Sequence, residues 1–204
     1  MVLGLSVFGF KKEFSSLALL LQLNISVDQD GKCLSPAGTA LNDEKMPPSF
    51  VEKMLETREK AINDMLAVCY TYIDQAEQET CKAKDSKMRE QCHLLTLGSL
   101  VYVFRALNIW KPRLTGSDIH QSIESFYQTI RKRKTSTLQE ASMTETRNLY
   151  AKKIYREIGH DACEHASKIM VDLEKVYEAV PTPIQDFQLE RIEQQYKKGR
   201  PMDG

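Results

Sequence analysis

The sequence predicts an all-α protein, a single-domain bundle of six to seven helices with no significant β-sheet. Apolar residues recur at three- and four-residue steps along most of the chain, which is the period of a helix packed on one side. Gly and Pro number only 9 and 7, and most lie between the periodic segments. The 204 residues are 42% apolar, which is enough to bury a core without metal or disulfide support.

Residues 1–24 are an N-terminal apolar or amphipathic segment. Lys11 and Lys12 interrupt its apolar run, so we expect neither a signal peptide nor a membrane-spanning helix. Four apolar residues follow the spacing of a nuclear export signal: Leu17, Leu20, Leu23 and Ile25. An amphipathic helix produces the same spacing, so packing on the bundle and docking on a partner both stay open.

A long helix is predicted after a loop or linker over residues 25–48, which is rich in Asp, Gly, Pro and Asn. Ser49 and Glu52 have the spacing of a capping box, so we expect the helix to begin there. Its apolar stripe continues for seven turns. The stripe consists of Val51, Met54, Leu55, Arg58, Ile62, Met65, Leu66, Cys69, Tyr72, Ile73 and Ala76.

The next helix is expected from about Asp85 to Asn108 and is apolar nearly all round between Leu94 and Leu107. A helix of that kind is surrounded by others, so we predict that it lies at the centre of the bundle. Trp110 and Pro112 close it.

Three further helices complete the predicted bundle, which spans residues 49–197. Ser117 is the expected N-cap of the first, whose stripe runs from Ile119 to Ile130. A less regular helix follows over about residues 138–158. A heptad-like seam between Ala162 and Val180 then packs against the central helix, a short helix covers about residues 184–196, and residues 198–204 form a polar tail.

The densest charge in the chain directly follows Ile130: Arg131, Lys132, Arg133 and Lys134. Cations in the last turn of a helix interact favourably with its exposed carbonyls, which accounts for part of this run. Four adjacent cations exceed what a helix end requires, so the run is also a candidate partner contact, phosphate contact or nuclear import signal. Thr135, Ser136 and Thr137 follow it, and are candidate phosphorylation sites in a basic context.

The sequence contains no recognisable catalytic or cofactor-binding motif. Gly-rich phosphate loops are missing, and the four His residues lie in no nucleophile-type context. One cluster resembles a metal site: His160, Asp161, Cys163, Glu164 and His165. On a helix its two histidines point about 140° apart, so we predict no metal, no cofactor and no enzymatic activity.

Lys plus Arg and Asp plus Glu both number 28, so the molecule has no net charge to attract nucleic acid or an anionic membrane. Five scattered cysteines without a recurring spacing indicate a reducing compartment, so we predict a cytoplasmic or nuclear location.

We therefore expect a non-enzymatic helical adaptor or complex subunit that scaffolds protein partners. The alternative is a nucleic-acid-associated or nucleocytoplasmic protein, a class that includes virus-encoded proteins, using the cations of Arg131 to Lys134. Homo-oligomerisation stays open, and we do not expect binding to a membrane surface.

Overall fold

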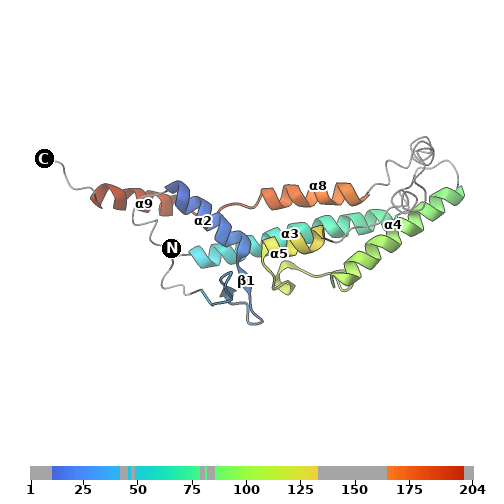
Figure 1. Ribbon diagram of the computed structural model, residues 1–204, viewed down its shortest axis with the longest axis horizontal. Helices are drawn as coiled ribbons and strands as arrows, with labels where there is room; N and C mark the ends of the chain where they lie inside the picture. The colour runs from blue at the N-terminus through green and yellow to red at the C-terminus, as the bar shows by residue number, and fades with distance from the viewer. Residues whose placement is uncertain are drawn as a thin grey trace. The chain divides into compact units, whose positions relative to one another are not determined.

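The computed structural model describes residues 11–41, 46, 49–78, 81, 86–132 and 165–199, and it confirms the all-α class. This part of the chain contains six α-helices and one small sheet with two residues in each strand. In chain order the helices are α2 (Lys11–Asn24), α3 (Phe50–Glu77), α4 (Ser86–Ala106), α5 (Ile123–Arg131), α8 (His165–Glu178) and α9 (Asp186–Gly199) (Figure 1). The helix predicted over residues 138–158 lies outside the described residues.

The chain divides into two compact units. Unit 1 comprises Met1–Ile62, Gly116–Phe126 and Ala179–Gly204, and unit 2 comprises Asn63–Thr115 and Tyr127–Glu178. Each unit is therefore built from segments that are far apart in the sequence.

In unit 1, helix α2 packs against the first turns of α3. Phe14 and Ala18 are fully buried, and the Phe14 ring lies 6.5 Å from that of Phe50, centroid to centroid. Gln22 is also buried, and its Nε2 donates a 2.9 Å hydrogen bond to the carbonyl of Met54. Residues 11–24 of the N-terminal segment thus pack on their own chain. Leu20 stays 57% exposed, so the buried stripe is not the one that the leucine spacing suggested.

Residues 25–41 of unit 1 form a short hairpin in the segment predicted as a loop or linker. Strand β1 (Ser26–Val27) pairs antiparallel with β2 (Cys33–Leu34). The turn depends on Gly31, whose φ of 77° is accessible to Gly at no steric cost. Asp28 Oδ1 accepts hydrogen bonds from the backbone N–H groups of Asp30 and Lys32, at 3.0 and 2.8 Å.

The segment from Gly116 to Phe126 is held against α3 within unit 1. The buried guanidinium of Arg58 donates to the carbonyls of Ile119 and Gln121, with its Nε 3.1 Å from the latter. Burial lowers the pKa of Arg58, because desolvation penalises its charged form. Gly116 is buried so closely that a Cβ there would overlap the carbonyl oxygen of Glu59. Arg58 and Gly116 therefore fix this loop.

Helix α5 begins later than predicted. Ser122 is its N-cap, because its Oγ accepts a 3.1 Å hydrogen bond from the N–H of Ser125 and its carbonyl accepts one of 2.9 Å from Phe126. The prediction of Ser117 as the cap is wrong, since Ser117 lies in a 3-10 turn (Gly116–Asp118). The regular stripe starts at Ile123, and the cap stands directly before it.

The C-terminal segment of unit 1 joins the same core. Ile184 packs against the cluster that contains Ala18 and Ile25, and α9 contacts α2. Gln188 is buried, and its Oε1 accepts a 3.0 Å hydrogen bond from the N–H of Gln185 at the start of α9. Phe187 of α9 is 46% exposed.

The core of unit 2 lies between the later turns of α3 and helices α4 and α8. Helix α8 runs alongside α3 in Figure 1, and Tyr72 of α3 hydrogen-bonds to Asp172 of α8. Of the predicted seam, Ile169 and Leu173 are buried. The other buried side chains of this unit include Met65, Leu66, Cys69, Ile73, Leu100, Val103 and Phe104.

Helix α4 ends in a Schellman motif, which the sequence pattern did not predict. Asn108 takes the left-handed conformation, with φ of 57°. Its N–H donates to the carbonyl of Arg105 at 3.0 Å, and the N–H of Ile109 donates to Phe104 at 2.9 Å. Ile109 and Phe104 are both buried, as the hydrophobic contact of this motif requires. The helix therefore ends at Ala106, just before the left-handed Asn108 and ahead of Trp110 and Pro112.

Candidate interaction surface

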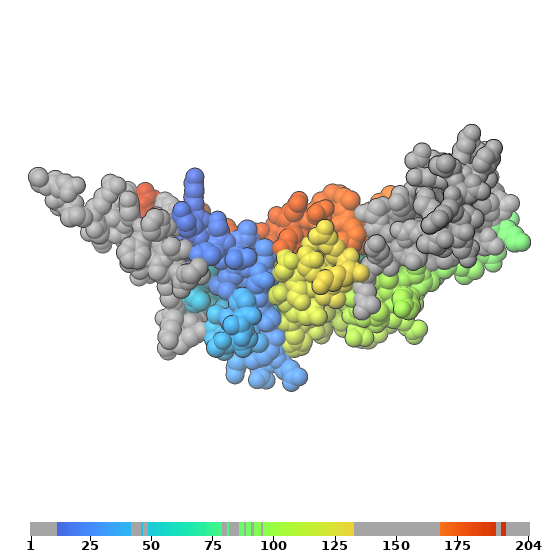
Figure 2. All heavy atoms as spheres, viewed as in Figure 1, coloured from blue at the N-terminus to red at the C-terminus, as the bar shows by residue number. Residues whose placement is uncertain are grey.

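Helix α4 is buried on one side only, so the prediction that Leu94 to Leu107 lie at the centre of the bundle is wrong. Cys92, Leu100, Val103 and Phe104 are buried. On the other side Leu94 is 60% exposed and Tyr102 is 74% exposed. Green atoms of α4 lie at the surface in Figure 2. The apolar residues that made the helix look central are partly on its outside.

Five exposed residues of α4 lie on one side of the helix, together with the exposed Lys87, whereas the exposed Arg89 lies on the opposite side. At about 100° per residue, Leu94 and Tyr102 lie about 40° to either side of Gly98, and Arg105 lies about 20° from it. Glu90 lies about 80° from Gly98 on the same side. All five are exposed, and we call them the α4 face: Glu90, Leu94, Gly98, Tyr102 and Arg105.

Gly98 is an unusual residue for this place. A Gly inside an exposed helix costs about 0.5–1 kcal/mol relative to Ala. Nothing lies within 4 Å of where a Cβ at Gly98 would be, so packing within the described residues does not require its small size. The α4 face thus carries no side chain at the position between its two large apolar residues.

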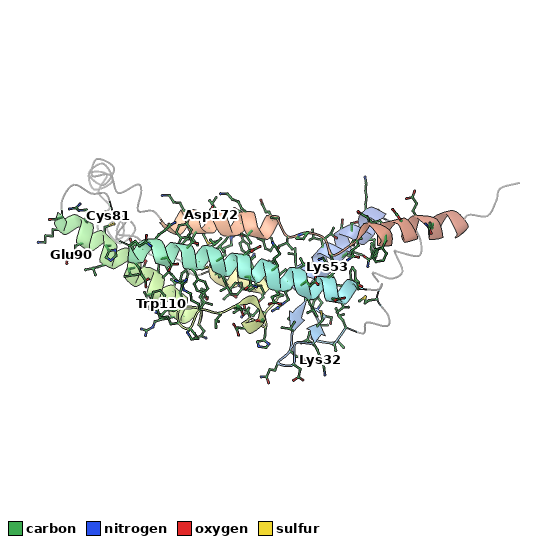
Figure 3. The ribbon with its side chains drawn as sticks, turned by 180° about the vertical axis from the view of Figure 1, so that it is seen from behind. Lys32, Lys53, Cys81, Glu90, Trp110 and Asp172 are labelled. Atoms are coloured by element: carbon green, nitrogen blue, oxygen red, sulfur yellow. The ribbon has the colours of Figure 1, made fainter. Side chains whose placement is uncertain are left out.

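The two charged residues of the α4 face flank its apolar middle. Glu90, labelled in Figure 3, lies towards the start of α4, and Arg105 lies in its last turn. Among the described residues neither forms an ion pair. Both side chains are exposed.

The basic run begins where α5 ends. Lys132 N–H donates a 3.0 Å hydrogen bond to the carbonyl of Gln128, which completes the last turn. Arg131 and Lys132 are both exposed. Arg133 and Lys134 lie outside the described residues, as do the phosphorylation candidates Thr135, Ser136 and Thr137. Arg131 lies in the last turn of α5, Lys132 directly follows it, and both side chains face solvent.

A polar cluster joins α3 to α8 in unit 2. Tyr72 Oη donates a 2.8 Å hydrogen bond to Oδ2 of Asp172, and Lys175 Nζ donates one of 2.8 Å to Oδ1. Desolvation and the bond to Asp172 raise the pKa of Tyr72 to about 12. Hydrogen bonds from Lys175 and Tyr72 lower the pKa of Asp172. Both groups keep their neutral-pH charge states, so the cluster serves as a structural link.

A second polar group ties the chain after α4 to α3. The N–H of Leu114 donates a 2.7 Å hydrogen bond to Tyr70 Oη. Arg113 lies 5.1 Å from the centroid of the Tyr70 ring and pairs with Asp74. The hydrogen bond to Asp74 raises the pKa of Arg113. These contacts hold the segment that leaves α4.

The described cysteines and acidic residues supply no evident reactive centre. Burial raises the pKa of the Cys69 thiol to about 12, so it stays protonated at neutral pH. Within the described ranges, no three His, Cys, Asp or Glu side chains gather as metal ligands would. Of the cluster from His160 to His165, residues 160–164 lie outside those ranges.

The α4 face was not singled out from the sequence, although a signal for it was present. Gly98 interrupts the run "LLTLGSLVYV" in the middle of a helix, where Gly is unfavourable unless close approach requires it. An apolar run with such a Gly also fits a helix whose outer side meets a partner.

Comparisons with protein-family models, curated proteins and solved structures found no match. None of the described helices is both long and apolar enough to cross a membrane.

Proposed function

We propose that this protein is a non-enzymatic helical adaptor or complex subunit that binds another protein through the α4 face. The observation that carries the proposal is the exposure of Leu94 and Tyr102, at 60% and 74%, on one side of one helix. Single exposed apolar residues are normal on a protein surface. Leu94 and Tyr102 are two large apolar side chains on one side of one helix, and exposed apolar surface of this kind is found at interaction sites.

The chemistry of the α4 face suits a protein partner. Tyr is enriched where protein interfaces are energetically important, because its ring buries a large area at low entropic cost. Leu94 adds apolar area, and Glu90 and Arg105 provide a charged rim. This arrangement, an apolar middle with a polar edge, is the usual anatomy of a protein–protein interface.

Affinity purification from the native cells tests the proposal. The bait is the full chain with Leu94→Gln and Tyr102→Gln together, compared with the wild-type chain. A matched control is Val171→Gln, since Val171 is also an exposed apolar residue, on α8 of the same unit. We expect the double variant to lose a protein that wild type and control both retain. Retention of the same proteins by all three baits would refute the proposal.

A second candidate function rests on the exposure of Arg131 and Lys132 at the end of α5. In this function the basic run contacts phosphate or a nuclear import receptor, and the protein is nucleic-acid-associated or moves between nucleus and cytoplasm. Changing Arg131, Lys132, Arg133 and Lys134 to Gln tests it. Nucleic-acid binding that is lost in the variant and weakens steeply with salt supports this function. Wild-type protein that binds no nucleic acid at low salt and is not concentrated in nuclei contradicts it.

A further inference from the structure

The four residues with the spacing of an export signal do not lie on one side of α2. At about 100° per residue, Leu17 and Leu23 each lie about 60° from Leu20. Leu20 is 57% exposed, and Leu17 and Leu23 are partly exposed. Ile25 continues the last turn, because its N–H donates a 2.9 Å hydrogen bond to the carbonyl of Leu21. It lies about 140° from Leu20 and is fully buried. The fold therefore hides the fourth residue of the pattern.

Ile25 is held in the apolar cluster of unit 1. The cluster also contains Cys33 of the hairpin and Phe50 and Met54 of α3. A receptor groove that recognises a helical segment binds several apolar side chains of that segment together. Because Ile25 has an exposed fraction of 0%, it cannot enter such a groove while it stays in the cluster.

The contact between α2 and α3 is weakened close to Ile25. Gln22, three residues before it, is fully buried, and its Nε2 bonds to the carbonyl of Met54. Within the described residues, Gln22 Oε1 accepts no hydrogen bond. A buried acceptor without a partner costs free energy, and that cost is relieved when water reaches the atom. The unpartnered oxygen therefore favours opening of the last turn of α2.

We propose that α2 is a masked nuclear export signal. Its last turn opens, Ile25 leaves the cluster, and Leu17, Leu20, Leu23 and Ile25 bind together in the apolar groove of a nuclear export receptor. The receptor selects the open form, which is a minor population of the free protein. The apparent affinity is reduced by the fraction of molecules that are open, so a change that loosens α2 strengthens export. This role is separate from binding at the α4 face, which belongs to unit 2.

Hydrogen exchange of the full chain tests the opening. Backbone amides of residues 21–25 should exchange faster than those of residues 54–58 in α3. Gln22→Met removes the unpartnered oxygen and keeps a similar volume, so it should slow exchange of residues 21–25 several-fold. The matched control is Gln188→Met, because Gln188 is also buried but its Oε1 has a partner. This control should not slow exchange of residues 21–25.

A fluorescent fusion of the full chain in cultured cells tests the export. The fusion carries an added import signal, so entry into the nucleus does not depend on the run from Arg131 to Lys134. Ala18→Glu places a charge at a fully buried position and should loosen α2 without changing the four residues of the signal. We expect the nuclear-to-cytoplasmic ratio to fall several-fold in this variant, and an inhibitor of the export receptor should restore it.

Two double variants distinguish export from unfolding. Leu20→Ala added to Ala18→Glu removes one signal residue at an exposed position and should return the fusion to the nucleus. Phe187→Ala added to Ala18→Glu is the control, since Phe187 is another exposed apolar residue of unit 1, and it should leave the fusion cytoplasmic.

Either experiment can overturn the proposal. Equal exchange of residues 21–25 and 54–58, or unchanged exchange in Gln22→Met, would show that the last turn of α2 does not open as proposed. A fusion that stays nuclear in Ala18→Glu, or that stays cytoplasmic after Leu20→Ala is added, would show that α2 carries no masked export signal.

Discussion

Tyr72 of α3 donates a 2.8 Å hydrogen bond to Asp172 of α8, a residue 100 positions later in the chain. The bond joins two helices of unit 2, and the Tyr72 side chain is nearly buried. It is therefore a long-range contact whose loss should be measurable in stability.

Tyr72→Phe removes the hydroxyl and keeps the ring. We expect the free energy of unfolding at pH 7 to fall by about 0.5–1.5 kcal/mol, the usual net value of an intramolecular hydrogen bond. Urea unfolding followed by circular dichroism measures this. Asp172 keeps its bond to Lys175, so a loss well above this range would mean that the ring had also moved.

The same bond predicts a loss of stability at alkaline pH. The pKa of Tyr72 is raised in the fold from its ordinary 10.0 to about 12. A raised pKa stabilises the fold fully below the unfolded pKa, and the contribution disappears as pH rises through the folded pKa. Wild-type stability should thus fall towards that of Tyr72→Phe between pH 10 and about 12. A constant difference between the two proteins over this range would contradict the assignment.

Gly116→Ala should destabilise the protein by about 1–3 kcal/mol, because the new Cβ overlaps the backbone of Glu59. The matched control is Gly98→Ala, where the Cβ meets nothing within 4 Å. That change should stabilise the protein by about 0.5–1 kcal/mol through helix propensity. Thermal unfolding at low protein concentration compares the two. Equal effects would mean that the close approach at Gly116 is incorrect.

Ser122→Ala should lower the free energy of unfolding by about 1 kcal/mol, because the N–H of Ser125 loses its capping oxygen. Ser117→Ala should change it by less than about 0.5 kcal/mol, as is usual for an exposed position. Urea unfolding of both variants measures the difference. The reverse order would restore Ser117 as the start of the helix.

The long apolar stripe of α3 shows what a periodic sequence pattern predicts correctly. Apolar residues at helical steps predicted a helix from Ser49, and α3 begins at Phe50. Met54, Ile62 and Met65 are all buried as predicted. The spacing of apolar residues along a helix predicts which face is buried. This prediction does not require knowing which elements pack against that face.

Helix α4 shows where composition misleads. Its apolar run indicated a helix and its bounds were close, but apolar content does not say which side packs inward. The exposure of Leu94 and Tyr102 depends on the neighbours that the fold supplies. The α4 face was therefore beyond sequence reasoning, apart from the unexplained Gly98.

The ends of the helices were predicted less accurately than their middles. Ser117 and Ser122 are both capable caps, and only the surrounding loop decides between them. Asn108 was overlooked because a left-handed residue closes a helix through backbone geometry, and Asn is tolerated there without being obligatory. Which residue caps a helix thus depends on tertiary contacts in this protein.

Unit 1 draws on three stretches of chain, the last of which starts at Ala179. During synthesis on a ribosome, Ala18 and Ile25 emerge early, yet Ile184, which packs against their cluster, is among the later residues to be made. All of unit 2 has been translated before that point. The cluster around Ala18 and Ile25 therefore stays partly uncovered until Ile184, which follows all of unit 2 in the chain, has been made.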